Sequence, residues 1–113
     1  MTPAKREALR MMFGGRCAYC GEVLDDKFHR EHVHPRYRGG SDSEENIWPA
    51  CEKCNRFKST FSIEQFRGEL ALQLERARRY SINFRMAEKF GLVKETAKPV
   101  VFWFEQYRKE QAA

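Results

Sequence analysis

The length, composition and charge of the chain exclude several classes of protein. Its 113 residues suffice for one domain with a modest core. No apolar run approaches the length that crosses a bilayer, and residues 1–6 lack the apolar stretch of a secretory signal. We therefore expect an intracellular protein without a membrane partner. The formal net charge of +5 and the pI of about 9.2 favour a polyanionic partner.

All four cysteines and all three histidines lie within residues 17–55. The cysteines form two C-x-x-C pairs, Cys17 with Cys20 and Cys51 with Cys54. In a reducing compartment, paired thiolates ligate zinc more readily than they form disulfides, because four of them complete a tetrahedral site. One pair alone would be equally consistent with an ordinary loop carrying two free thiols. The two pairs together predict a structural zinc ion.

The first predicted element is a helix over residues 3–13. Thr2 followed by Pro3 is typical of a helix start, and apolar residues recur on one face until a glycine pair ends it. The chain then enters the first cysteine pair, where Gly21 permits the tight turn of a zinc knuckle.

A β-hairpin and a helix are predicted next. Residues 28–33 have the bulky composition of a strand that ends at Pro35, and residues 47–50 form a short apolar strand that can pair with it. The polar, glycine-containing residues 36–46 are a connection. The second cysteine pair opens a short helix over residues 51–58. We expect zinc to clip the hairpin and the helix together.

Glu31 and His32 are neighbours in the first predicted strand, where adjacent side chains point to opposite faces. They can share one site only where the strand ends or bulges. Pro35, shortly after them, favours such an end.

The remainder of the chain is predicted to be mostly helical. A capping box and apolar residues at helical spacing predict a helix over residues 63–79. Ser81 and Gly91 bracket a second helix over residues 82–90. Residues 100–107 are rich in aromatic and β-branched side chains and fit a strand or a helix equally well.

The segment around the cysteines carries a further pattern. Its parts, in chain order, are Cys17-x-x-Cys20, Glu31-His32-Val33-x-Pro35, Gly39-Gly40, Asn46 and Cys51-x-x-Cys54-Asn55-x-x-Lys58. Over residues 16–59 this pattern resembles an HNH endonuclease of the ββα-metal type, and the coincidence of so many parts makes it specific.

The resemblance implies a core in which a β-hairpin and a helix hold one divalent ion. Together with the helices predicted above, the expected fold is α+β and mostly helical, with a zinc-stapled ββα-metal core (a β-hairpin plus a helix), an N-terminal helix and C-terminal helices. We expect a single nuclease domain over residues 1–113. Residues 1–60 would form the core, and residues 61–113 a helical extension.

The resemblance also implies a metal-dependent DNA endonuclease that hydrolyses phosphodiester bonds. His32 takes the place of the general base, since an imidazole can accept a proton from water at neutral pH. Glu31 and Asn55 take the places of ligands to one catalytic Mg²⁺ or Mn²⁺, which prefers oxygen donors. Glu31 departs from the aspartate usual in the family. Asn46 takes the place of an asparagine that pins the loop and so holds the strand carrying His32.

DNA is the expected partner. The zinc would contribute to folding only, because four thiolates leave no open coordination position. Small size and a basic tail suggest a cytoplasmic nuclease encoded by a phage or a bacterium. The sequence favours neither a monomer nor a homodimer. The candidates for contacting phosphates are Arg30, His34, Arg36, Arg38, Arg56 and Lys58.

Each candidate also has an explanation without catalysis. His32 fits a surface histidine, Glu31 a solvated carboxylate at a strand edge, and Asn55 a helix cap. An alternative function is a non-catalytic, zinc-ribbon-like module that binds nucleic acid. A protein-interaction adaptor would account for the aromatic C-terminal run. Neither alternative explains why a base and hard metal ligands lie between two zinc knuckles.

Overall fold

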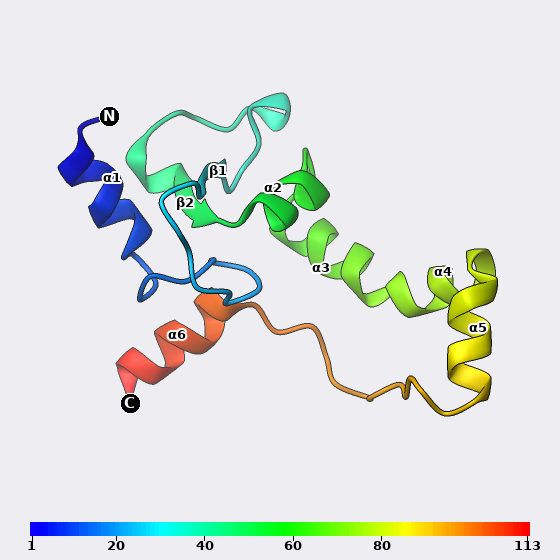
Figure 1. Ribbon diagram of the computed structural model, residues 1–113. Coiled ribbons are helices and arrows are strands. Elements are labelled where there is room, and N and C mark those ends of the chain that lie inside the picture. Colours follow the sequence, from blue (N-terminus) through cyan, green and yellow to red (C-terminus); the bar gives the residue numbers. More distant parts are fainter. The chain divides into compact units, whose positions relative to one another are not determined.

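The computed structural model of the chain describes residues Met1–Ala113. It contains six α-helices, two 3-10 helices and one two-stranded antiparallel sheet (Figure 1), which confirms the predicted α+β class. None of the helices has both the length and the apolar character needed to cross a bilayer. The elements are α1 (Pro3–Arg10), β1 (His29–His32), η1 (Arg36–Arg38), η2 (Glu44–Asn46), β2 (Ile47–Ala50), α2 (Glu52–Lys58), α3 (Ile63–Ala71), α4 (Gln73–Tyr80), α5 (Ile82–Lys89) and α6 (Trp103–Ala112).

The chain divides into two compact units. The first consists of Met1–Ile63 together with Val101–Ala113, and the second of Glu64–Val100. The second unit is close to the predicted helical extension. The difference is that α6 returns to the first unit.

The two strands of the first unit form the predicted hairpin. Their register places Glu31 opposite Trp48 and His32 opposite Ile47. All of β2 is buried, whereas Glu31 is the only buried residue of β1. The helix α2 follows β2 directly and contacts β1. The hairpin and helix therefore occur in the predicted order.

An aromatic core lies beside the sheet. Trp48 of β2 packs edge-on against Phe13, with ring centroids 5.3 Å apart, and contacts Phe104 at 4.6 Å. Tyr19 of the first cysteine knuckle packs against Phe102 at 5.4 Å. Such pairs add to the free energy gained by burying the rings.

The segment that fitted a strand or a helix equally well is the helix α6. Its first turn is bound to the knuckle backbone, since the Trp103 and Phe104 N–H groups donate to the carbonyls of Tyr19 (3.0 Å) and Ala18 (2.8 Å). The indole Nε1 of Trp103 donates to the carbonyl of Phe13 at 2.8 Å. These bonds tie the C-terminal segment to the part of the chain that holds the cysteines.

The first helix is shorter than predicted. It begins with the expected cap, because the Thr2 hydroxyl accepts from the Lys5 N–H at 3.2 Å. It ends at Arg10, since the Met12 N–H bonds three residues back, to the Leu9 carbonyl. The following residues continue as tight turns.

The helix predicted over residues 63–79 is two helices, α3 and α4, that meet at Leu72. The Gln73 side-chain amide donates to the Glu69 carbonyl at 2.7 Å, and the Leu72 N–H bonds the same carbonyl at 3.2 Å. These two donors take the place of the Gln73 backbone N–H, which would bond the Glu69 carbonyl in an uninterrupted helix. Side-chain chemistry thus interrupts an otherwise sound helical pattern.

In the second unit, α4 and α5 are joined at Ser81, whose hydroxyl caps α5 by accepting from the Phe84 N–H at 3.1 Å. Arg78 holds the two helices together by binding both carboxylate oxygens of Glu88 (2.7–3.1 Å). Gly91, with φ of 75°, follows the end of α5 as predicted.

Candidate functional site

The four cysteine sulfurs form one cluster, with every sulfur within 4.8 Å of the others. The Cys20 and Cys51 sulfurs are 3.8 Å apart. A tetrahedral site with Zn–S bonds of about 2.3 Å has sulfurs about 3.8 Å apart. A disulfide needs about 2 Å, and all four cysteines are free. The donor set and its spacing therefore fit a structural zinc ion.

The backbone supports this cluster. N–H groups point at the sulfurs of Cys17, Cys20 and Cys51 at 3.4 Å. Gly21, with φ of 78°, turns the first knuckle, where a side chain would meet the Trp103 ring. The Ala18 N–H donates to the Pro49 carbonyl at 2.9 Å, so the knuckle is fastened to β2.

The thiols oppose one another's ionisation. The pKa values of Cys20 and Cys54 are raised, chiefly because each shares a hydrogen bond with Cys17. The same sharing lowers the pKa of Cys17. Negative charge on one sulfur thus disfavours charge on the others, and a bound cation would remove that penalty.

A second site lies at the end of β1, in a shallow pocket of about 250 Å³. Glu31, His32 and Asn55 all line it, together with Arg30, Pro35, Arg36, Tyr37, Ser59 and Thr60. β1 ends at His32, so the neighbours Glu31 and His32 reach the same pocket despite the alternation along a strand. The structure thus brings together three residues that the sequence singled out.

Glu31 lines this pocket but is only 3% exposed. The Tyr19 hydroxyl donates to Oε2 at 2.6 Å, and the Lys58 ammonium donates to Oε1 at 2.9 Å. Burial raises the pKa of the Glu31 carboxyl, and these two hydrogen bonds oppose that rise. Burial, and then the nearby Glu31 carboxylate, raise the pKa of Tyr19 well above its ordinary value. The tyrosine therefore remains a donor.

Lys58 is fully buried at the end of α2. Besides Glu31, its ammonium donates to the carbonyls of His32 (3.1 Å) and Val33 (3.0 Å). An ammonium has three protons, so its hydrogen-bonding capacity is filled. The structure contradicts the prediction that Lys58 contacts phosphate. Lys58 instead holds the end of β1 from beneath.

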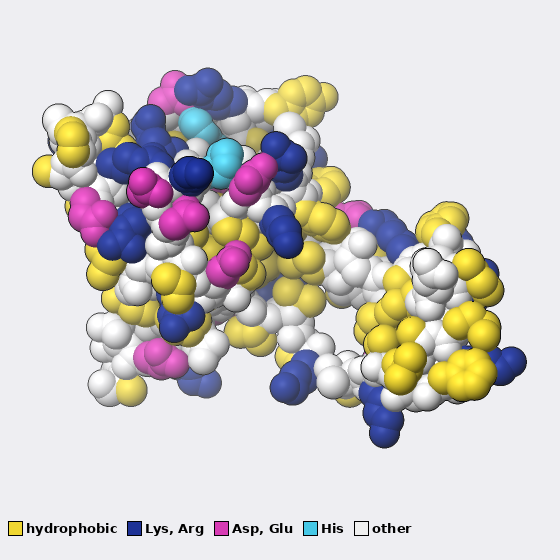
Figure 2. Space-filling model, in the orientation of Figure 1, with side chains coloured by type: hydrophobic (Ala, Val, Ile, Leu, Met, Phe, Trp, Pro, Cys, Tyr) yellow, Lys and Arg dark blue, Asp and Glu magenta, His cyan; other side chains and the backbone are white.

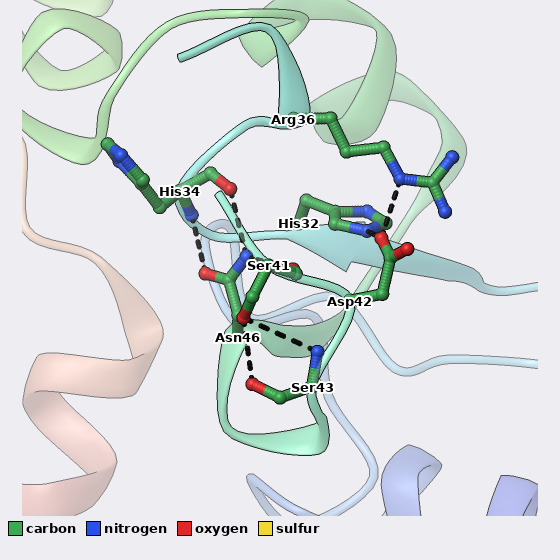
Figure 3. A network of polar contacts seen from close by, with 7 residues as sticks. All are labelled: His32, His34, Arg36, Ser41, Asp42, Ser43 and Asn46. Carbon is green, nitrogen blue, oxygen red and sulfur yellow. Dashed lines mark hydrogen bonds and ion pairs between the residues drawn. The ribbon is translucent and has the colours of Figure 1, made fainter. Parts of the chain in front are cut away.

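His32 lies above this buried pair at the surface of the pocket. Its Nε2 is 2.8 Å from Oδ1 of Asp42, which also accepts from Nε of Arg36 at 2.6 Å (Figure 3). Hydrogen bonds from Arg36 and then His32 lower the pKa of Asp42, so its carboxylate only accepts. In a neutral imidazole the proton therefore sits on Nε2, which leaves Nδ1 as the acceptor nitrogen.

Asn46 fastens the loop that carries Asp42. Its side-chain oxygen accepts from the His34 N–H at 2.8 Å, and its amide nitrogen donates to the His34 carbonyl (2.9 Å) and the Ser41 carbonyl (2.7 Å) (Figure 3). The Val33 N–H donates to the Asn46 carbonyl at 2.9 Å. One asparagine thus joins the chain just after β1 to the neighbour of Asp42.

Asn55 is half-buried on α2, and its amide nitrogen lies 3.4 Å from Nδ1 of His29. An amide that donates its N–H there keeps its oxygen available for another partner.

The remaining phosphate candidates are all exposed. The Arg30 side chain has no hydrogen-bond or ion-pair partner and lines the pocket. Arg38 donates to the Thr60 carbonyl at 2.6 Å, and Arg56 pairs with Glu52 at 2.8 Å. The His34 ring points away from His32 (Figure 3). Figure 2 shows histidine side chains on this face among both basic and acidic side chains.

A comparison with protein families matches this part of the chain to one family model, HNH endonuclease, over residues 17–61. The HNH endonuclease family is thus matched by one segment of the chain, residues 17–61. The match confirms the resemblance predicted over residues 16–59. No curated protein matches the chain.

The HNH segment, residues 17–61, contains all four cysteines and every polar residue of the pocket. The match suggests that this segment is a nuclease that binds nucleic acid and has a metal-binding site. Both centres described above thus fall within the part of the chain that the family covers.

The sequence did not predict a role for two residues of the HNH segment, Tyr19 and Asp42. Tyr19 lies between two cysteines and Asp42 in a polar loop, so neither stands out by residue type. Lys58 was noticed but misinterpreted. It follows Cys51 and Cys54 by seven and four positions, which places it on the same helix face as these two inward-facing cysteines.

Proposed function

We propose that the chain is a metal-dependent DNA endonuclease that hydrolyses phosphodiester bonds, with His32 as the general base. The observation that carries this proposal is the single pocket, inside the HNH segment, that Glu31, His32 and Asn55 line together. An imidazole, a carboxylate and an amide oxygen in one pocket are the groups that metal-assisted hydrolysis of a phosphodiester needs.

His32 would take a proton from the attacking water through Nδ1, because Asp42 occupies Nε2. Asp42, Arg36 and the Asn46 clamp would fix the ring, and Lys58 would fix the backbone beneath it. A base held in place loses less entropy in the transition state.

Glu31 and Asn55 would hold one Mg²⁺ or Mn²⁺. Each Glu31 oxygen accepts one hydrogen bond and retains a second lone pair, so the buried ion pair does not exhaust the carboxylate. When bound, the ion would stabilise negative charge on the phosphate and on the leaving 3′ oxygen. The four-cysteine cluster would hold zinc for folding only.

The exposed side chains around the pocket would contact the DNA backbone. Arg30 is the foremost candidate, because it is exposed, lines the pocket and has no partner within the chain. The other candidates are His34, Arg36, Arg38 and Arg56.

The role of His32 is tested by His32→Ala in a nicking assay on supercoiled plasmid. Loss of a general base lowers a rate by about 100-fold to 10,000-fold, while folding and DNA binding should stay near those of the unaltered chain. His34→Ala and His29→Ala should lose less activity. If His34→Ala lost as much activity as His32→Ala, the assignment of His32 as the general base would be wrong. If His32→Ala failed to fold, the role of His32 would be structural.

The catalytic metal is tested by chelation. We expect EDTA to abolish nicking at concentrations that leave the circular dichroism spectrum unchanged, because four thiolates hold zinc more tightly than two oxygen ligands hold Mg²⁺. Mg²⁺ or Mn²⁺ should restore activity, and extra Zn²⁺ should not. Asn55→Ala should raise the metal concentration for half-maximal rate, whereas His32→Ala should not. Full activity in excess EDTA would favour the non-catalytic binding module.

A further inference from the structure

An exposed tyrosine stands at the rim of the pocket. Tyr37 is the middle residue of η1 (Arg36–Arg38), and 83% of its surface is open to solvent. Its side chain lines the same pocket as Glu31 and His32. No other ring packs against it, and its hydroxyl has no hydrogen bond. A single exposed aromatic side chain is common on protein surfaces, so exposure alone assigns it no role.

The backbone that carries Tyr37 is held by hydrogen bonds within the turn. The N–H groups of Arg38 and Gly40 both donate to the Pro35 carbonyl at 2.9 Å. Gly39 has φ of 86°, which glycine adopts without strain. A Cβ on Gly40 would lie 1.7 Å from the His34 carbonyl oxygen, so the turn closes tightly on the chain after β1.

The side chains on either side of Tyr37 brace the turn further. Nε of Arg36 donates to Asp42, and Nε of Arg38 donates to the Thr60 carbonyl, each at 2.6 Å. These two bonds connect η1 to the loop on one side of the pocket and to the residues after α2 on the other. Tyr37 therefore extends outward from a backbone that these bonds hold in place, which lowers the conformational entropy lost when its ring binds a ligand.

Three arginines lie near Tyr37 in the sequence or in the pocket, and one of them, Arg36, is paired with Asp42. Arg36 and Arg38 flank Tyr37 in sequence and are exposed, and Arg30 lines the same pocket without an ionic partner. An aromatic ring with neighbouring guanidinium groups matches a nucleotide, whose base offers a flat face and whose phosphate offers negative charge.

We propose that Tyr37 is a stacking platform for an unpaired nucleobase next to the phosphate in the pocket. A base inside a duplex has both faces covered by its neighbours, so a protein ring can stack on it only after it has left the stack or in a single strand. The substrate class is then a single strand, or a duplex with an unstacked base at the cleaved position. This inference rests on the proposed function, because it concerns the same pocket.

The test measures binding without added divalent ions, so that no strand is cut. The probes are a fluorescent single-stranded thymidylate of about 12 nucleotides, the same strand with abasic sites, and a blunt duplex of equal length. Tyr37→Ala should weaken binding of the thymidylate by between about 5-fold and about 150-fold, the range for losing one aromatic stacking partner. Tyr37→Phe should bind like the unaltered chain, since phenylalanine keeps the ring.

Three comparisons decide the result. The abasic strand should bind the unaltered chain and Tyr37→Ala with equal affinity, because it has no base to stack. The affinity for the blunt duplex should be the same in Tyr37→Ala as in the unaltered chain. Tyr80→Ala is the matched control, since Tyr80 is a tyrosine of similar exposure (76%) in α4, and it should not change binding of the thymidylate.

Thymidylate binding that is unchanged in Tyr37→Ala, or an equal loss with the abasic strand, would overturn the proposal. Plasmid nicking by the unaltered chain with added Mg²⁺, combined with thymidylate binding that is unchanged in Tyr37→Ala, would refute the platform and leave the nuclease. Binding that depends on Tyr37 without any cleavage would refute the nuclease and leave the platform.

Discussion

The buried pair of Lys58 and Glu31 gives the sharpest test of how the site is held. The Lys58 ammonium has no exposure and bonds one carboxylate and two carbonyls. Lys58→Met keeps most of the side-chain volume and removes all three donors. Glu31 then remains buried as a charge whose only remaining side-chain donor is the Tyr19 hydroxyl.

The expected cost follows from this geometry. Removing one partner of a buried ion pair destabilises a protein by about 3–5 kcal/mol. This range already includes the cost of leaving the His32 and Val33 carbonyls without their donor. The free energy of unfolding of a native protein is about 5–15 kcal/mol, so Lys58→Met should remove a large share of the stability. The double variant Lys58→Met, Glu31→Gln should lose less stability than Lys58→Met alone, because no charge remains buried and the amide oxygen at position 31 can still accept from the Tyr19 hydroxyl.

The assay is urea unfolding followed by tryptophan fluorescence. Both tryptophans, Trp48 and Trp103, lie in the first unit, so the signal reports the unit that contains the pair. Lys53→Met is the control, since Lys53 is an exposed lysine of the same helix and should change stability by less than about 0.5 kcal/mol. Equal stability of Lys58→Met and Lys53→Met, or a double variant no more stable than Lys58→Met alone, would show that the buried pair does not hold the site in this way.

Two further outcomes are expected. Elemental analysis should find about one zinc per chain, lost in Cys51→Ser, and a native mass showing two disulfides would contradict the site. In the second unit, Arg78 lowers the pKa of Glu88 below its ordinary value of 4.5, so the ionised pair stabilises α4 and α5 above that pH and this contribution is lost as pH falls toward the lowered pKa. An NMR titration should give a Glu88 midpoint below 4.5 that rises in Arg78→Met, and an unchanged midpoint would show that the pair does not form.

The hairpin, α2 and the cysteine cluster were predictable because local patterns specify them. Pro35 follows the end of the first strand at His32, the apolar run at residues 47–50 pairs with that strand, and the cysteine spacing specifies the cluster. These signals are short in range and depend on residue type alone.

The buried network was not predictable from such signals. Tyr19 and Glu31 are 12 positions apart, and Lys58 is a further 27 away, so their meeting depends on how the hairpin packs on α2. A lysine at the end of a helix is also the usual choice for a solvated position. Only tertiary structure shows that this one points inward.

The C-terminal helix shows a different limit of prediction from composition. Aromatic and β-branched residues suit a strand and a buried helix alike, so composition alone left residues 100–107 open. What decides for the helix is tertiary contact, since the first turn of α6 finds acceptors in the carbonyls of Ala18 and Tyr19.

That contact also governs the order in which the protein can fold. Phe102 and Phe104 complete the aromatic core of the first unit, yet Glu64–Val100 precede them in the chain. The core cannot close until α6 has left the ribosome, and the helices of the second unit, which precede α6, can form on local contacts before that. Until then, the aromatic faces of Tyr19 and Trp48 lack their final partners. The nascent chain is most prone to aggregation in that interval, and a stop codon before Phe102 would make that state permanent.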